Sequence, residues 1–587
     1  MDEKTSGREP IQIIEIEQDF CTRTYGTAPC TAALGVGSQN KCFNTLATCQ
    51  DAPHFDPEIK VLRFSKPTSA RVPMVHSYPF LKSASTAPTI INPGGGKSGS
   101  SPLGQRAVLR VSMLDAPSTD SQVDKYLDER AYNSLDRGTF WSKWLARNQF
   151  YRNRKIRVLD GYKGQALNAF MKREYIIDAI DGPNSRGDVT ITAKDVLVLA
   201  DDDKAKAPKP SKGELAEDMP TGAITRILIA GASLSDYPSA GTVRIGRELF
   251  KYTASSTELT NIKLTGLTRA SDRTIEAAHK IGDKVQECLR YTDIRCDEIA
   301  YELLTTYGNV PSSYINKPVW EAEAALWLNQ FEISAIITEP TGVKTLLAEI
   351  TEQCLFHIWW DERAQLIKLE ALKPPIYDSI PVITEAKNII ADSVTIKDDQ
   401  SRRVSQVWIS YGMRDPTDKA DDANNYDRAR VSANLDSELP IRYGESKIKA
   451  IYSRWLQTDA QVANVGTRLL NRFSKPPKVV KIELDAKDRN FWTGGIVDMS
   501  VGGVVDYTGL QVLTRYQITS AEETDAGSKI ELTLDQYEYQ AGKRYGRWMI
   551  DLAPDYTAAT PLEKELGFFW SDAAGKMSDG SNGYVWG

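Results

Sequence analysis

CTRTYGTAPCTAALGVGSQNKCFNTLATC, residues 21–49, is the stretch around which the rest of the chain is organised. It holds four of the seven cysteines, separated by gaps of eight, eleven and six residues: Cys21, Cys30, Cys42 and Cys49. The other three are far along the chain: Cys288, Cys296 and Cys354. So dense a group of thiols indicates that sulfur chemistry ties this stretch together, through two disulfides, a structural zinc ion or an iron–sulfur cluster.

The expected cellular compartment of the chain and the spacing of its cysteines help to choose between these three kinds of site. The N-terminus, MDEKTSGREP, is polar and has no apolar signal-peptide core, so we expect a chain in a reducing cytosol, where structural disulfides are uncommon. Zinc sites usually pair two cysteines in one tight turn, and none of the three gaps is that short. Wide, uneven gaps let separate loops converge on a cubic cluster. The residues alone favour a cluster and leave zinc, disulfides and reduced structural thiols open.

Three strings in this stretch resemble the cysteine motif of a known family. They are CTRTYGTAPC from Cys21, KCFNT around Cys42 and TCQD around Cys49. The motif is similar to that of tail-tip hub proteins of long non-contractile-tailed bacteriophages, relatives of the lambda minor tail protein L and the hub of gene transfer agents. The resemblance implies that Cys21, Cys30, Cys42 and Cys49 hold a 4Fe–4S cluster. Unlike the lambda arrangement, the motif here lies near the N-terminus of a long chain.

Two later strings, WEAEA at residues 320–324 and WWDERAQLIKL at 359–369, resemble the same family. The resemblance implies a structural, non-enzymatic protein of the virion tail tip, assembled in the bacterial cytoplasm. It implies a homotrimer that joins the tail tube and distal tail protein to the central fibre and meets the tape measure protein. The cluster would then be a cross-link between loops. An iron–sulfur oxidoreductase and a cell-wall-degrading tail enzyme are the alternatives, although the sequence contains neither a dinucleotide fingerprint nor a paired-carboxylate pattern.

Composition sets outer limits on the function. The 587 residues are enough for several domains. A net charge of −6 gives no indication of a nucleic-acid surface. No apolar run approaches the roughly 18 residues that cross a bilayer, so we expect no stable membrane insertion. Only four histidines occur, far apart, which argues against a histidine-based active site.

The pattern of elements predicts a mainly β, multidomain chain with α+β parts, in which β-barrel or sandwich hub domains accompany the iron–sulfur segment. The predicted parts are an N-terminal strand, cysteine segment and linker arm (1–104), a first β-barrel (105–205), a small inserted β domain (206–290), an α+β domain (291–400), a second β-barrel (401–545) and a C-terminal docking extension (546–587).

Local patterns place the elements within these parts. Alternating apolar residues predict strands at 11–17, 60–65, 105–114, 155–159, 173–180, 188–199, 242–245, 248–253, 263–267, 404–411, 479–484, 495–499, 510–519 and 529–537. Helical periodicity predicts helices at 139–150, 292–306, 318–328, 342–358 and 458–473. Residues 359–369 are predicted to form a hairpin that buries at least one of its two tryptophans. Residues 66–104, rich in Pro, Ser, Thr and Gly, are predicted to be a loop or extended arm.

Three other features of the sequence are candidate sites. GGGKS at residues 94–98 resembles a phosphate-binding loop, but Ile91 stands where that motif needs its first glycine, so we interpret it as a linker. Cys288 and Cys296 are interpreted as ordinary buried thiols. Residues 269–285 resemble a segment common in phage tail proteins, a small adaptor-like module in which Gly282 and Asp283 turn between two extended segments, with no assigned ligand.

The tail after residue 545 carries clustered aromatic residues, which are costly to leave exposed. If they dock on a partner or neighbouring subunit, truncation after Tyr545 leaves a folded chain that assembles poorly. Particle yield and circular dichroism of the truncated chain test this. Normal completion of tails by the truncated chain contradicts the docking role.

Overall fold

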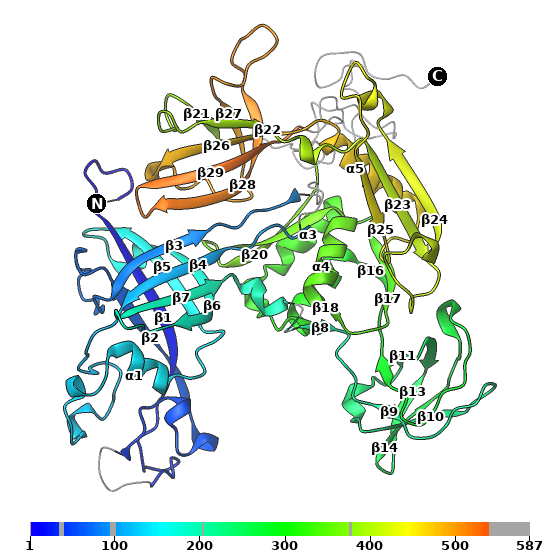
Figure 1. The fold of residues 1–587 in the computed structure, drawn as a ribbon, viewed down its shortest axis with the longest axis horizontal. Helices are drawn as coiled ribbons and strands as arrows, with labels where there is room; N and C mark the ends of the chain where they lie inside the picture. The colour runs from blue at the N-terminus through cyan, green and yellow to red at the C-terminus, as the bar shows by residue number, and fades with distance from the viewer. Residues whose placement is uncertain are drawn as a thin grey trace, which may run out of the picture.

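A computed structural model describes residues 2–33, 40–93, 101–201, 203, 205–374 and 379–538. Figure 1 shows a central group of helices with a curled N-terminal sheet on one side, a small β unit at the lower right and two further sheets from the C-terminal third. The chain is therefore mainly β with α+β parts, as predicted. The GGGKS string and the extension at 546–587 lie outside the described residues. Within the described ranges, no helix is both long and apolar enough to span a membrane.

The N-terminal sheet is a seven-stranded half-barrel. Its strand order is β2-β1-β5-β6-β7-β4-β3, with β1 (Pro10–Cys21), β2 (Pro57–Ser65), β3 (Leu81–Ala87), β4 (Val108–Leu114), β5 (Lys155–Tyr162), β6 (Met171–Asp181) and β7 (Asp188–Lys194). The edges approach each other where Phe64 of β2 bridges Tyr78, shortly before β3. Alternate side chains fill the inside, as the period of two predicts.

Helix α1 (Phe140–Arg147) packs against this core through its aromatic side chains. Thr139 begins the helix with a reciprocal cap in which its backbone N–H donates to the Ser142 hydroxyl at 3.0 Å. Trp141 then stacks on Phe64 with ring centroids 5.2 Å apart. The helix predicted at 139–150 is confirmed, in a shorter form that places three buried aromatic residues on the sheet.

A small β unit follows in two sheets. One has the order β13-β14-β10-β9 and the other β12-β11-β15; their bounds are β9 (Glu214–Leu215), β10 (Arg226–Ala230), β11 (Gly241–Ile245), β12 (Glu248–Tyr252), β13 (Ala254–Glu258), β14 (Asn261–Thr265) and β15 (Val285–Glu287). The two sheets enclose their own apolar core, with Val243, Phe250 and Leu264 fully buried. The strands of these two sheets, from residue 214 to residue 287, fall within the small β domain predicted at 206–290 and have their own core.

The central unit combines helices with short sheets around one large core. Its elements are β8 (Lys206–Ala207), β16 (Leu289–Arg295), α2 (Cys296–Glu302), α3 (Lys317–Trp327), β17 (Glu332–Ile337), β18 (Thr341–Gly342), α4 (Val343–Gln353), β19 (Phe356–Asp361) and β20 (Leu366–Ala371). The predicted β19–β20 hairpin is confirmed. Both of its tryptophans are buried, Trp359 at 6% and Trp360 at 1% exposure, so neither forms part of an exposed partner surface.

The C-terminal third contains two sheets. A six-stranded sheet has the order β21-β27-β28-β29-β26-β22, and a three-stranded sheet has the order β24-β23-β25. Their strands are β21 (Val382–Thr384), β22 (Thr395–Asp398), β23 (Gln406–Met413), β24 (Tyr426–Ala433), β25 (Ile448–Tyr452), β26 (Lys478–Asp485), β27 (Ile496–Ser500), β28 (Thr514–Asp525) and β29 (Lys529–Gln536). Helix α5 (Asp459–Phe473), capped by Thr458 as predicted, covers one face of the three-stranded sheet.

The prediction that residues 401–545 form a second β-barrel is wrong, because the strands form two open sheets. In the described residues the edge strands β21 and β22 pair with β27 and β26 and not with each other, so this sheet stays open. Both of these strands precede residue 401, where the second barrel was predicted to begin. Strands β23, β24 and β25 form a separate sheet because α5, and not the other strands, covers their apolar face.

Several predicted boundaries are also wrong. The arm at 66–104 contains β3, whose Ser, Thr and Ala residues form a strand because β4 supplies a pairing partner. The strand predicted at 188–199 ends at Lys194, and the apolar residues Val196–Ala200 form a buried 3₁₀ turn. Both errors arise because pairing with a distant strand, and not local composition, decides where a strand exists.

Two helix predictions were too long. The helix predicted at 292–306 starts four residues later, at Cys296, because the preceding residues pair with β17 as strand β16. The helix predicted at 342–358 ends at Gln353; Leu355 has a left-handed φ of 57°, after which β19 begins. The last strand boundary moves too, since β28 begins at Thr514 and Leu510 lies in an exposed loop.

Trp360 connects the hairpin to the half-barrel, because its indole N–H donates to the Glu174 carbonyl of β6 at 3.0 Å. Trp360→Phe keeps the aromatic packing and removes this donor, so local stability at β19 and β6 should fall by about 1–3 kcal/mol. Amide hydrogen exchange of the two strands measures it. Trp408→Phe is the matched control: Trp408 is 47% exposed, and its replacement should change stability by less than about 0.5 kcal/mol. Equal effects of the two substitutions contradict this account.

Candidate functional site: the four-cysteine segment

The cysteine segment is the connection of a β-hairpin. Strands β1 and β2 pair antiparallel from Ile13 and Ser65 to Cys21 and Pro57, so the chain between them leaves and re-enters the sheet at adjacent points. At this point the Cys21 amide donates to the Asn44 carbonyl at 2.7 Å, which folds the middle of the segment back onto its start. The half-barrel therefore positions the segment through its backbone.

The structure brings the four predicted cysteines together. Cys21, Cys30, Cys42 and Cys49 line one small cavity, together with Tyr25, Ala32, His54 and Phe55. Their thiols are free, as are those of the three remaining cysteines. Burial raises the pKa of Cys42 and of Cys49, and the charges of the other thiols of the group raise it further.

The arrangement is not that of a tight single-ion site. Within the described ranges, no group of three or more His, Cys, Asp or Glu side chains is arranged to hold a metal ion. A single zinc ion needs four sulfur atoms about 2.3 Å from one centre, and hence about 3.8 Å from each other. A four-iron cluster is larger and takes one cysteine at each iron. Four cysteine ligands are the donor number of both kinds of site.

A buried ion pair from outside the segment holds it in place. Arg130 donates to Asp124 through Nε at 2.8 Å, and the two side chains are 0% and 1% exposed. The same guanidinium donates to the carbonyl of Lys41 at 2.9 Å and to that of Cys42 at 3.1 Å. It also stacks on Phe43, 4.2 Å from the ring centroid. Three consecutive residues, 41–43, are thus fixed by one arginine.

Asp51 orders the second half of the segment. Its carboxylate accepts the Thr31 amide at 2.6 Å and His54 Nδ1 at 2.9 Å. The Thr31 amide, followed by His54, lowers the pKa of this carboxyl below its ordinary value. The Asp51 amide in turn donates to Cys49 Sγ at 3.4 Å, a contact that favours the thiolate form.

Sequence reasoning found the four cysteines and missed the groups that hold them. These groups lie about a hundred residues after the cysteines they hold: Asp124, Tyr126 and Arg130. The Tyr126 hydroxyl accepts the Tyr25 amide at 2.8 Å. No local pattern marks these residues, because an isolated arginine or tyrosine is ordinary in any loop. Asp51 and His54 lie beside the motif, and their short i, i+3 spacing was the one available signal.

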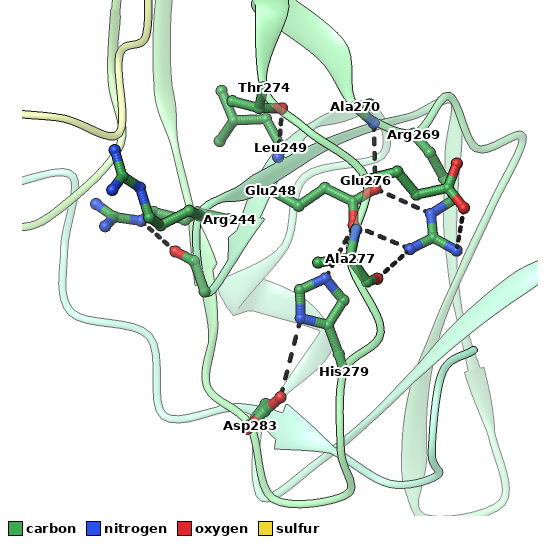
Figure 2. Close-up of polar contacts among 12 residues, drawn as sticks. Arg244, Glu248, Leu249, Arg269, Ala270, Thr274, Glu276, Ala277, His279 and Asp283 are labelled. Atoms are coloured by element: carbon green, nitrogen blue, oxygen red, sulfur yellow. Dashed lines mark hydrogen bonds and ion pairs between the residues drawn. The ribbon is translucent and has the colours of Figure 1, made fainter. Parts of the chain in front are cut away.

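The segment predicted to be adaptor-like contains a second polar cluster, shown in Figure 2. Fully buried Glu248 accepts Arg269 Nε and Nη2, both at 2.9 Å, and His279 Nε2 at 2.9 Å. The Ala277 amide adds a donor at 3.0 Å. Both carboxylate oxygens are saturated by donors, so this cluster cross-links the loops of the small β unit and offers no free base.

The remaining sequence-predicted groups are dispersed. Cys288 and Cys296 are buried thiols, as predicted. The four histidines lie in different parts of the fold: His54 in the cysteine segment, His76 beside the half-barrel, His279 in the small β unit and His357 in the β19–β20 hairpin. No two of these described histidines pair with each other in an ion pair or ring contact.

No protein-family model matches the chain, and no curated protein does. Solved structures resemble it. The tail protein from Neisseria meningitidis MC58 is 12% identical, with a TM-score of 0.37 over 77% of this chain and 96% of that one. The 43 kDa tail protein of prophage MuSo2 from Shewanella oneidensis is 10% identical, with a TM-score of 0.35 over 78% and 98%. A chain of the native gene transfer agent virion is 11% identical, with a TM-score of 0.28 over 57% and 86%. At TM-scores this low, the likeness by itself decides neither function nor partners.

Removing one partner of the Arg130–Asp124 pair leaves a buried charge uncompensated. Arg130→Met should therefore lower the local free energy of opening of residues 40–56 by about 3–5 kcal/mol, measured by amide hydrogen exchange. Adding Asp124→Asn should restore part of the loss. Arg137→Met is the control, because Arg137 is exposed and stacks only on Tyr132. If Arg130→Met lowers the free energy of opening no more than Arg137→Met does, the Arg130–Asp124 pair does not hold the cysteine segment in place.

Proposed function

We propose that the chain is a structural hub protein of a phage-type tail tip in which Cys21, Cys30, Cys42 and Cys49 hold a 4Fe–4S cluster. In this role it forms a homotrimer and joins the tail tube and distal tail protein to the central fibre, next to the tape measure protein. The observation that carries the proposal is the convergence of four thiols, from separate loops, on one cavity at the end of a hairpin. This is the ligand set that the motif resemblance implies.

When bound, the cluster supplies four covalent iron–sulfur links between loops and needs no electron transfer for this role. The chain's own residues do the positioning. Arg130 holds the backbone around Cys42, and the Asp51 amide donates to the sulfur of Cys49. Among the described residues between 22 and 56, Ala32 is the one buried apolar side chain, so a cross-link would replace a core that this segment lacks.

An exposed apolar sheet face supports an assembly role. On the side of the three-stranded sheet away from α5, Trp408 pairs with Val431 across the ladder, and the two are 47% and 53% exposed. Ile448 and Tyr452 of β25 continue this face, at 51% and 39% exposed. Contiguous apolar surface of this kind marks protein contacts in assembled proteins.

The cluster is tested by metal analysis and visible absorption of the anaerobically purified chain. About four iron and four sulfide per chain with a broad brown band are expected. Replacement of each ligand, Cys21→Ser, Cys30→Ser, Cys42→Ser or Cys49→Ser, should remove the band and lower particle yield. Cys354→Ser is the control, since this buried thiol lies in the central core, and should change neither.

Other outcomes overturn defined parts of the proposal. One zinc per chain without colour keeps the hub and replaces the cluster by a single ion. Neither metal, with thiols that pair only in air, removes the metal centre. Normal iron content and particle yield in all four ligand variants refute the ligand assignment.

A further inference from the structure

A cavity of about 1160 Å³ lies between the central unit and the six-stranded sheet. Helix α3 forms one wall with Val319, the β19–β20 hairpin contributes Trp359 and Arg363, and the residues leading into β27 contribute Arg489 and Trp492. This volume is above the range of roughly 300–1,000 Å³ typical of small-molecule pockets, so the cavity has room for a larger occupant such as a chain segment. The site already described does not use this cavity, which belongs to another part of the fold.

Several buried donors in its wall lack an acceptor. Arg363 Nε and Nη2, Trp359 Nε1 and Trp492 Nε1 are buried and have no hydrogen-bond partner among the described residues. An unpaired buried donor costs about 1–3 kcal/mol, and more when it is charged. Three side chains with this deficit line one cavity, so an acceptor bound in the cavity would satisfy them if the side chains rotate toward it.

The charge of the wall selects an anionic acceptor. Two lysines of the wall are paired, Lys368 with Asp361 at 3.1 Å and Lys373 with Glu323 at 3.0 Å. Arg363 forms no ion pair with any described carboxylate; it stacks on the ring of Trp492, 3.2 Å from the centroid. Burial lowers the pKa of Arg363 to about 10. A carboxylate would compensate this buried cation.

The described chain ends at the edge of this cavity. After β29, the Tyr537 hydroxyl donates to the carbonyl of Lys373, a wall residue, at 2.7 Å. Residues 546–587 follow, with six Asp or Glu against three Lys or Arg, a net charge of −3. They also carry several large aromatic residues, among them Trp548 and the cluster Phe568, Phe569 and Trp570. Ten residues of extended chain reach about 33 Å, so this segment can enter the cavity from its own chain.

We propose that the cavity binds the acidic, aromatic C-terminal segment of the same chain, residues 546–587, with a carboxylate of the segment paired to Arg363. Tethering at Tyr537 gives the segment a local concentration of roughly millimolar, so weak contacts are enough to hold it. The orphaned indole donors of Trp359 and Trp492 then find acceptors on the segment. This inference does not depend on the metal centre or on the role in a phage tail.

The test is photo-crosslinking in the full chain. A benzophenone amino acid replaces Val319, which lines the cavity and is 56% exposed, or Val431, which is 53% exposed on the far sheet face and serves as the matched control. Mass spectrometry of a mixture of light and ¹⁵N-labelled chains then identifies the crosslinked peptides. We expect crosslinks from position 319 to residues 546–587 within one chain and none from position 431.

Charge variants complete the test. Arg363→Gln should reduce the yield of these crosslinks at least fivefold, whereas Arg403→Gln should leave it unchanged, because Arg403 is a buried arginine that also has two unpaired guanidinium nitrogens but does not line the cavity. If Arg363→Gln does not fold, the same pairing is tested by removing the carboxylates of the segment. Asp551 and Asp555 are replaced by Asn, and Glu563 and Glu565 by Gln. Absence of the crosslinks, crosslinks only between different chains, or a yield independent of these charges overturns the proposal.

Discussion

The antiparallel ladder between β1 and β2 is the constraint on which the cysteine segment depends. Strand β1 pairs with β2 on one side and with β5 on the other, so its path is fixed by two neighbours over most of its length. Cys21 is the last residue of that strand. A segment with few core residues of its own thereby starts and ends at points that are set by a rigid sheet. The loops that carry Cys30, Cys42 and Cys49 need only fold over one end of the half-barrel.

A second set of buried polar contacts aligns the separate cores. Arg173 of β6 donates to Asp160 of β5 at 2.7 Å and lies 3.3 Å from Glu523 of the six-stranded sheet. Glu174, the next residue, accepts the Tyr314 hydroxyl of the central unit at 2.7 Å. Buried charges of this kind add little net stability but are costly to separate. They therefore specify how the half-barrel, the central unit and the six-stranded sheet meet.

These features support the proposed role as an assembly component. In two polar clusters, Glu248 accepts from buried internal donors and Arg130 donates to internal acceptors, so both clusters cross-link loops. Its exposed apolar side chains lie on a sheet face and at loop tips, where Tyr507 is fully exposed. Rigid units with fixed loops and apolar outer faces are compatible with the proposed hub role, which the resemblance of the cysteine motif also implies.

The sequence by itself determined the elements whose signals are local. The capped, amphipathic α5, the β19–β20 hairpin and the strands around the cysteine segment all follow from periodicity and from residues such as Thr458. The four thiols and their grouping were also visible, because they lie within one short window. Local signals failed at β3 and at the start of α2, where pairing with another strand overrides composition.

Only the tertiary structure decided which strands pair, which charges clamp the cysteine segment and which walls form the large cavity. Arg130 meets Cys42 across 88 residues, and the Tyr162 hydroxyl donates to the Gly527 carbonyl across 365 residues. Contacts over such separations depend on the simultaneous packing of several elements, each of which is compatible with many neighbours. Periodicity and capping act within a few residues and carry no information about that choice.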